Sequence, residues 1–184
     1  HYIQELQQQL LKDGCFIPGV KNEDENDFMK GAKITASSFA PLLLEGWDSE
    51  TRLSNFLGQK LPLEGKLEKL SLNIRAEKDT NLSFHLRSSS DLWDFTAEED
   101  ILEEKIPLKA GEQEVEIEIN REFPSGIYWF YLEPNEAVFL RETSEALPGA
   151  TEIYRIGNLW RFKLGKNLYL KTVPPIYPFI ASNI

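Results

Sequence analysis

Residues 112–119, EQEVEIEI, carry the clearest structural pattern in the sequence. Three apolar residues, Val115, Ile117 and Ile119, alternate in it with three glutamates. Strict alternation is typical of a β-strand with one buried and one solvated face. A shift of one residue would bury three carboxylates, so the register is strongly specified. We therefore predict a strand whose valine and two isoleucines are buried in the core. Its three glutamates, Glu114, Glu116 and Glu118, are predicted to face solvent.

The same period continues on both sides of this stretch. Nine further segments are predicted as short strands: residues 33–38, 67–76, 82–87, 101–108, 123–132, 137–142, 152–156, 159–164 and 167–173. Turn signals such as Pro124-Ser125-Gly126 and Gly157-Asn158 separate them. Pro107 favours an edge position for its strand. This pattern predicts a mostly β fold, an antiparallel two-sheet β-sandwich of jelly-roll or galactose-binding-like type.

The first 32 residues follow a different pattern. Ile3, Leu6, Leu10 and Leu11 have helical spacing, and Gly14 stands where a helix commonly ends. We predict a short N-terminal helix and a linker over residues 1–32, as the remnant of an upstream domain, and a β-sandwich domain over residues 33–184.

Composition restricts the functional classes. The chain of 184 residues has a formal net charge of -10, which disfavours nucleic acid and anionic membranes as partners. A single cysteine, Cys15, excludes an internal disulfide and a cysteine-based zinc cluster. The two histidines, His1 and His85, belong to no recognisable catalytic motif. We expect no catalytic residues and no metal site.

A polar ladder is the first candidate binding site. If 67–76 and 82–87 form a hairpin, matching their apolar faces sets the register of the opposite, polar face. The predicted pairs are Arg75 with Ser83, Asn73 with His85, and Ser71 with Arg87. Such a face can bind sugar hydroxyls or carboxylates, or dock on a neighbouring domain. An ordinary solvated sheet face requires the same polar residues, and strands in opposite sheets would scatter the ladder.

Two tryptophans are the second candidate. Trp47 and Trp93 stand in polar, loop-like segments, where exposed rings can stack on sugars or anchor the loop on the core. Trp129 and Trp160 stand in strands and are expected to fill the core. Acidic residues between 91 and 100 offer oxygen atoms for calcium, but they lack EF-hand spacing, so we assign them no metal.

Residues 6–14, LQQQLLKDG, and 16–24, FIPGVKNED, resemble a stretch near the end of the flavin domain in large bacterial FAD-dependent oxidoreductases. Members of this polysaccharide-utilisation family often accompany polysaccharide-degrading systems, and some carry polysaccharide-lyase-like labels. In that family a β-sandwich tail follows, and KITASS, residues 33–38, is similar to its entry strand. Residues 147–149, LPG, fit the same tail.

The resemblance implies a non-catalytic accessory C-terminal domain, used for structural support or docking, with the upstream flavin domain of the parent chain as its partner. The glycine-rich dinucleotide fingerprint is missing from this sequence, so FAD would belong to the parent and no cofactor is expected here. Whether the parent is exported is left open. The alternative is an independent carbohydrate-binding module. A self-contained hydrolase or lyase is disfavoured because no nucleophile and base stand out.

Overall fold

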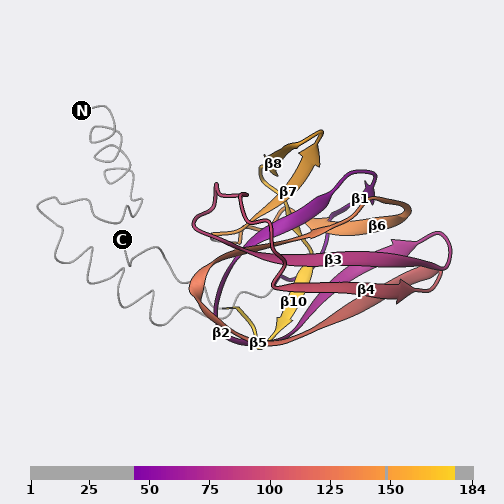
Figure 1. The fold of residues 1–184 in the computed structure, drawn as a ribbon. Helices are drawn as coiled ribbons and strands as arrows, with labels where there is room; N and C mark the ends of the chain where they lie inside the picture. The colour runs from indigo at the N-terminus through magenta and orange to yellow at the C-terminus, as the bar shows by residue number, and fades with distance from the viewer. Residues whose placement is uncertain (1–43, 148, 177–184) are drawn as a thin grey trace, which may run out of the picture. The chain divides into compact units, whose positions relative to one another are not determined.

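The computed structural model describes residues 44–147 and 149–176, and these are mostly β. The predicted N-terminal helix, the linker and the strand over 33–38 lie outside the described residues. The strands are β1 (Ser49–Leu53), β2 (Leu57–Ala76), β3 (Thr80–Ser89), β4 (Leu102–Leu108), β5 (Gly111–Leu132), β6 (Asn135–Thr143), β7 (Thr151–Ile156), β8 (Leu159–Lys163), β9 (Asn167–Leu168) and β10 (Leu170–Val173). Figure 1 shows their arrangement. No described segment is a helix that is long and apolar enough to span a membrane.

The strands form one hydrogen-bonded antiparallel sheet. Its main path runs β1-β6-β2-β5-β3-β4. Two further strands, β7 and β10, pair with β2, and β9 pairs with β6. β8 pairs with β7 as a hairpin, which stands at one end of the domain in Figure 1. Strand β4, which carries Pro107, ends the main path, so the predicted edge position is confirmed. The predicted mostly β, antiparallel fold is also confirmed.

Two long strands hold the sheet together. β2 and β5 have 20 and 22 residues and pair from Leu57↔Leu132 to Ala76↔Gly111. The first half of β2 has β7 as its other neighbour, whereas the second half has β10 and β6. The two long strands therefore run through parts of the sheet that have different neighbours.

The predicted turn at Pro124-Ser125-Gly126 is wrong. β5 continues through these residues, and the pairing steps from Leu63↔Gly126 to Gly65↔Phe123. Gly65 has a φ of 80°, a left-handed conformation that glycine adopts without steric cost. The pairing is irregular here, with one more residue on β5 than on β2. Pro124 lies in this irregular stretch, where its missing N–H breaks no regular ladder hydrogen bond, so the chain continues without reversing.

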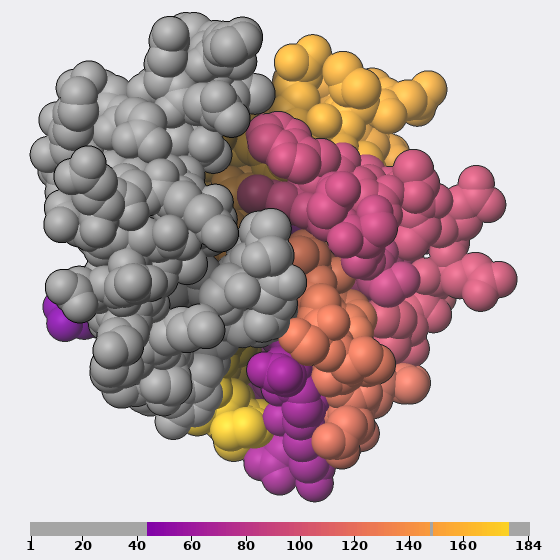
Figure 2. Space-filling view, turned by 90° about the vertical axis from the view of Figure 1, so that its left-hand side faces the viewer, coloured from indigo at the N-terminus to yellow at the C-terminus, as the bar shows by residue number. Residues whose placement is uncertain are grey.

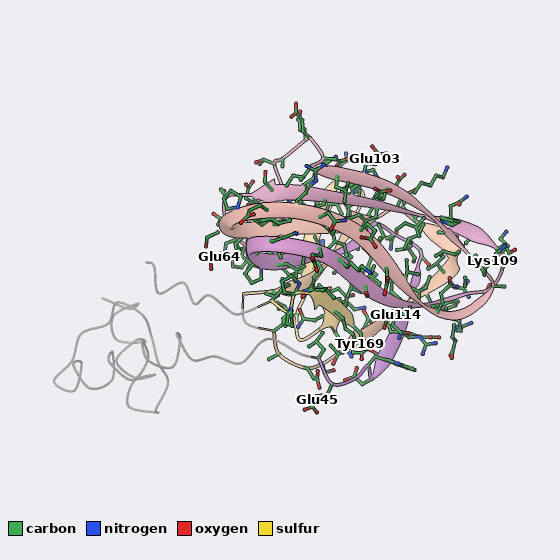
Figure 3. All side chains as sticks on the ribbon, turned by 90° about the horizontal axis from the view of Figure 1, so that it is seen from below. Glu45, Glu64, Glu103, Lys109, Glu114 and Tyr169 are labelled. Atoms are coloured by element: carbon green, nitrogen blue, oxygen red, sulfur yellow. The ribbon has the colours of Figure 1, made fainter. Side chains whose placement is uncertain are left out.

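The core confirms the decisive alternation. Val115, Ile117 and Ile119 are buried, and the glutamates between them are exposed. The predicted inward faces of the segments 67–76 and 82–87 are also buried, through these residues: Leu70, Leu72, Ile74, Ala76, Leu82, Phe84 and Leu86. Figure 3 shows charged side chains on the outer surface of the sheet, among them Glu103 on β4 and Glu114 on β5, with Lys109 in the turn between these strands.

Candidate functional site: an aromatic platform with a charged rim

A cluster of aromatic rings covers the face of β5 that points away from the main core. Trp129 and Tyr131 alternate with Phe130 and Leu132, so the two pairs serve opposite faces of the strand. Ile153 of β7 completes the buried part of this second cluster. We call the set the aromatic platform; its rings are Phe56, Phe95, Trp129, Tyr131, Trp160 and Phe162.

The rings of the platform pack in the geometries that aromatic quadrupoles favour. The Trp160 ring lies edge-on to Trp129, with centroids 5.1 Å apart and planes at 76°. It is stacked on Phe95, with centroids 5.8 Å apart and planes at 9°. Trp129 is buried, as predicted, whereas Trp160 is half-buried. The platform is therefore a small core of its own that fixes β8 and the segment after β3.

A buried lysine ties that segment, residues 90–100, to the sheet. The Nζ atom of Lys60 donates hydrogen bonds to Ser89 Oγ at 2.8 Å and to the Asp91 carbonyl at 3.2 Å, and it also contacts the Asp94 carbonyl. It lies 4.2 Å from the centroid of the Phe95 ring. Burial, partly offset by the Asp94 and Asp91 carboxylates, lowers the pKa of Lys60 to about 8. Lys60 belongs to no sequence motif, yet its contacts fix this segment on the sheet.

The segment presents Trp93 at the margin of the platform. The Trp93 side chain is 74% exposed, and its ring lies edge-on to Phe162, with centroids 4.8 Å apart. Asp94 shapes the turn by accepting hydrogen bonds from the Ser90 and Thr96 backbone amides, both within 2.9 Å. Hydrogen bonds from Thr96 and Ser90 hold the pKa of Asp94 well below its usual range. Figure 2 shows the pink segment after β3 beside the amber β7–β8 hairpin.

Charged groups line the other margin of the platform. The His85 ring is stacked on Tyr131, and Asp100 and Glu133 each place an oxygen 2.8 Å from one of its ring nitrogens. Arg87 Nε donates to Asp100 at 2.8 Å. Burial disfavours the charged imidazolium, but the contacts with the two carboxylates outweigh this effect and raise the pKa of His85.

The predicted polar ladder does not form, because β2 and β3 are not partners in the sheet. Their apolar faces meet in the same core cluster without lying side by side. On β2, Ser71, Asn73 and Arg75 lie opposite Glu116, Glu114 and Glu112 of β5. On β3, Ser83, His85 and Arg87 have β4 and β5 as neighbours. The structure brings three of the eight candidates, His85, Arg87 and Trp93, to the platform and its rim.

Trp47 and Arg75 have other surroundings. The Arg141 guanidinium lies 4.0 Å from the Trp47 ring, which leaves this side chain 46% exposed. Arg75 pairs with Glu50 at 2.8 Å and lies 4.0 Å from the Phe139 ring. These contacts explain both side chains as parts of a packed outer surface near β1 and β6.

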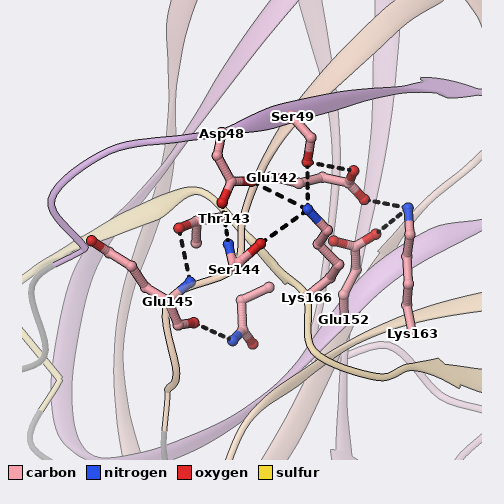
Figure 4. A network of polar contacts seen from close by, with 10 residues as sticks. Asp48, Ser49, Glu142, Thr143, Ser144, Glu145, Glu152, Lys163 and Lys166 are labelled. Atoms are coloured by element: carbon pink, nitrogen blue, oxygen red, sulfur yellow. Dashed lines mark hydrogen bonds and ion pairs between the residues drawn. The ribbon is translucent and has the colours of Figure 1, made fainter.

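A buried acid–lysine cluster was not predicted from the sequence. Lys163 Nζ lies 2.5 Å from Glu142 and 3.4 Å from Glu152, two carboxylates with 3% and 0% exposed side chains (Figure 4). Burial, together with the neighbouring Glu142, raises the pKa of Glu152 to about 9, so this carboxyl holds a proton at neutral pH. Beside Lys163 is a cavity of about 260 Å³, lined by Thr51, Arg52, Asn55, Leu57, Tyr154 and Lys163. Since 30 acidic residues are present, no spacing in the sequence distinguishes this pair.

Comparison of the chain with protein-family models, with curated proteins and with solved structures gives no match.

Proposed function

We propose that the chain is a non-catalytic accessory domain of a larger FAD-dependent oxidoreductase-like protein, and that it docks on the flavin domain of that protein. The observation that carries the proposal is the β7–β8 hairpin, an edge of the sheet with exposed apolar side chains. Ile156 and Leu159 are 56% and 57% exposed, and β8 has no second neighbour among the described strands. An apolar, unpaired edge is a liability that soluble proteins usually cover.

Charge complements this apolar surface. Residues 151–166 contain four basic residues, Arg155, Arg161, Lys163 and Lys166, and only one acidic residue, Glu152. The chain as a whole carries a net charge of -10, so the basic character is local. Lys163 pairs with Glu142 and Glu152, and Lys166 pairs with Asp48, so the positive charge near the exposed isoleucine and leucine comes from the two arginines. That charge complements an acidic, partly apolar protein surface. The resemblance of residues 6–24 to the end of a flavin domain supplies the identity of that partner.

The role of the rim residues favours a structural interpretation over catalysis. Both ring nitrogens of His85 contact carboxylates, and the Lys60 ammonium group contacts three oxygens. A general base must direct its lone pair at a substrate, whereas both nitrogens of His85 are directed at carboxylates of the chain. The contacts of Lys60 with Asp91 and Asp94, and of His85 with Asp100, instead hold the 90–100 segment on the sheet.

We also propose the finer architecture of a two-sheet sandwich. β8-β7 and β3-β4 would flank the first half of β2 and the second half of β5 in one sheet, and β1-β6 would flank the remaining halves in the other. This assignment is supported by the change of neighbours along β2 and by the core cluster that collects apolar side chains from both groups. The jelly-roll or galactose-binding-like type remains part of the proposal.

The docking experiment uses the flavin domain encoded upstream in the parent reading frame, prepared as a separate protein, with association measured by calorimetry. The double variant Ile156→Glu/Leu159→Glu should weaken association by about 10-fold or more, as expected for central apolar contacts. Val173→Glu is the matched control, because Val173 is also an exposed apolar residue, on β10. A parent frame without a dinucleotide fingerprint, or two domains that do not associate, would refute the proposal.

Carbohydrate binding is the second candidate, and Trp93 is the observation in its favour. A 74% exposed indole beside a half-buried aromatic cluster offers a flat surface to a pyranose ring. Affinity electrophoresis in gels that contain soluble polysaccharides tests it. If the platform binds sugar, migration is retarded, Trp93→Ala removes the retardation, and Trp47→Ala leaves it unchanged. Equal migration in all gels would exclude this candidate for the polysaccharides used.

A further inference from the structure

His85 makes two contacts that a neutral imidazole cannot satisfy together. Its Nδ1 lies 2.8 Å from Asp100 Oδ2, and its Nε2 lies 2.8 Å from Glu133 Oε2. A neutral imidazole has one N–H and one lone pair, and an ionised carboxylate only accepts. One contact therefore sets a lone pair against an anionic oxygen, unless a proton or a metal ion lies there.

A third carboxylate completes the surroundings of the ring. Glu103 of β4 is the direct cross-strand partner of His85. Ligand atoms of His85, Asp100 and Glu103 lie within 4.8 Å of one another. The three residues come from β3, from β4 and from the end of the 90–100 segment, so the fold and not a sequence motif brings them together.

We propose that His85, Asp100 and Glu103 form a binding site for a divalent transition-metal ion of the zinc type. Zinc takes imidazole nitrogen and carboxylate oxygen as ligands, and three protein ligands leave its fourth position open. Magnesium and calcium prefer sites made of oxygen alone, so the histidine selects against them.

Residues that contact these three ligands would fix their orientation, as hydrogen-bonding residues around the ligands do in known metal sites. With its proton on Nε2, His85 would donate to Glu133, 2.8 Å away, and its Nδ1 lone pair would bind the ion. Arg87 Nε donates to Asp100 Oδ1 at 2.8 Å, which leaves Oδ2 for the ion. The Tyr131 ring, stacked at 4.6 Å and 11°, fixes the plane of the imidazole. His85 is buried, whereas Glu103 is exposed and gives access from solvent.

The site would brace the segment that carries Trp93. Asp100 ends this segment, and Lys60 holds its other end through the Asp91 and Asp94 carbonyls. A bound ion would join Asp100 to β3 and β4 and so reduce the mobility of residues 90–100. This consequence does not depend on docking or on sugar binding.

Zinc titration by calorimetry, after removal of metals with EDTA, tests the site. The background carries His1→Ala and Cys15→Ser, since an N-terminal histidine and a thiol also bind zinc. We expect one equivalent of zinc to bind and Co²⁺ to give a visible absorption spectrum. His85→Gln should abolish both signals, and Glu133→Gln should weaken zinc binding by about 10–100-fold, as an outer-shell change does.

Glu103→Gln and Glu104→Gln form the matched pair. Both residues are exposed on β4, but they point to opposite sides of the strand, so only the first should weaken zinc binding. This pair keeps the test valid if His85→Gln unfolds the domain, which circular dichroism would reveal. The absence of saturable binding, or equal affinity in the two glutamate variants, would overturn the proposal.

Discussion

The ammonium group of Lys60 lies 4.2 Å from the ring centroid of Phe95, so a buried cation on β2 meets a ring in the irregular segment that follows β3. The two residues are far apart in the sequence, and neither stands in a motif. Their contact holds Phe95 in the aromatic platform and fixes the segment that carries Trp93. The stability of the segment should therefore depend on this one lysine.

We expect Lys60→Met to release the 90–100 segment. The methionine fills similar space but leaves the Asp91 and Asp94 carbonyls without their donor, a loss of about 1–3 kcal/mol in the free energy of unfolding. Urea denaturation measures this loss, and hydrogen exchange should show faster exchange between residues 90 and 100. Lys66→Met on the same strand is the control, because that lysine side chain is 62% exposed. Unchanged exchange in Lys60→Met would contradict the assigned role.

The buried carboxyl of Glu152 should make stability depend on pH. Its folded-state pKa of about 9 lies above the ordinary value of 4.5, so the folded protein binds more protons than the unfolded chain between these values. The free energy of unfolding contributed by Glu152 is fully present below the lower value and decreases as pH rises toward the upper one. Glu152→Gln stays neutral and should lose this contribution to the slope.

Urea denaturation of the wild type and of Glu152→Gln across this pH range checks the expectation. The variant should gain stability relative to the wild type as pH rises. Glu118→Gln, at an exposed glutamate of β5, should instead follow the wild type at each pH. Parallel curves for the wild type and Glu152→Gln would show that the carboxyl ionises without cost, for example through the nearby Lys163.

The alternation of apolar and polar residues correctly predicted which side chains are buried in strands that bury only one face. The alternation over residues 112–119 placed Val115, Ile117 and Ile119 in the core, and the apolar sets of 67–76 and 82–87 were also placed correctly. The pairing of these two segments was wrong, because an apolar face says which side a strand buries but not which strand lies beside it. Each segment pairs with β5 instead, a contact of longer range.

The first half of β2 was missed for another physical reason. Residues 57–63, LGQKLPL, are all buried, on both faces, because β5 and β7 flank this part of the strand and side chains cover it above and below. Gln59 and Lys60 are polar residues at such positions, so the sequence lacks the alternation that predicts a strand. Lys60 contacts the Phe95 ring of the platform, and Gln59 lies opposite Glu152 of the acid–lysine cluster in the pairing of β2 with β7.

We expect Ile117→Ala to destabilise the domain strongly. Ile117 is 1% exposed within the main core cluster, so the truncation leaves a cavity, at a cost of about 2–5 kcal/mol in the free energy of unfolding. Chemical denaturation followed by tryptophan fluorescence measures it. Glu116→Ala, one position away on the solvated face, should stay within about 0.5 kcal/mol of the wild type. A near-neutral Ile117→Ala would show that the register of β5 is wrong.

Gly58 should tolerate no side chain at all. It lies where β2 is paired on both sides, opposite Tyr131 of β5 and Ile153 of β7. A Cβ atom at this position would lie 1.9 Å from the Phe130 carbonyl oxygen and 2.8 Å from the Tyr131 Cα. Both atoms belong to the backbone of the neighbouring strand, so no rotamer change relieves the clash. The strands must separate, and their hydrogen bonds weaken.

We therefore expect Gly58→Ala to cost about 3 kcal/mol or more, at the upper end of what overpacking does. The loss should appear in chemical denaturation, and weaker near-ultraviolet circular dichroism should accompany it, since Trp129 and Tyr131 lie on the displaced strand. Gly46→Ala is the matched control, because a Cβ there meets nothing within 4 Å. If Gly58→Ala is as stable as Gly46→Ala, β2 and β5 do not approach each other this closely. The register in which they pair, and with it the arrangement of the aromatic platform, would then be wrong.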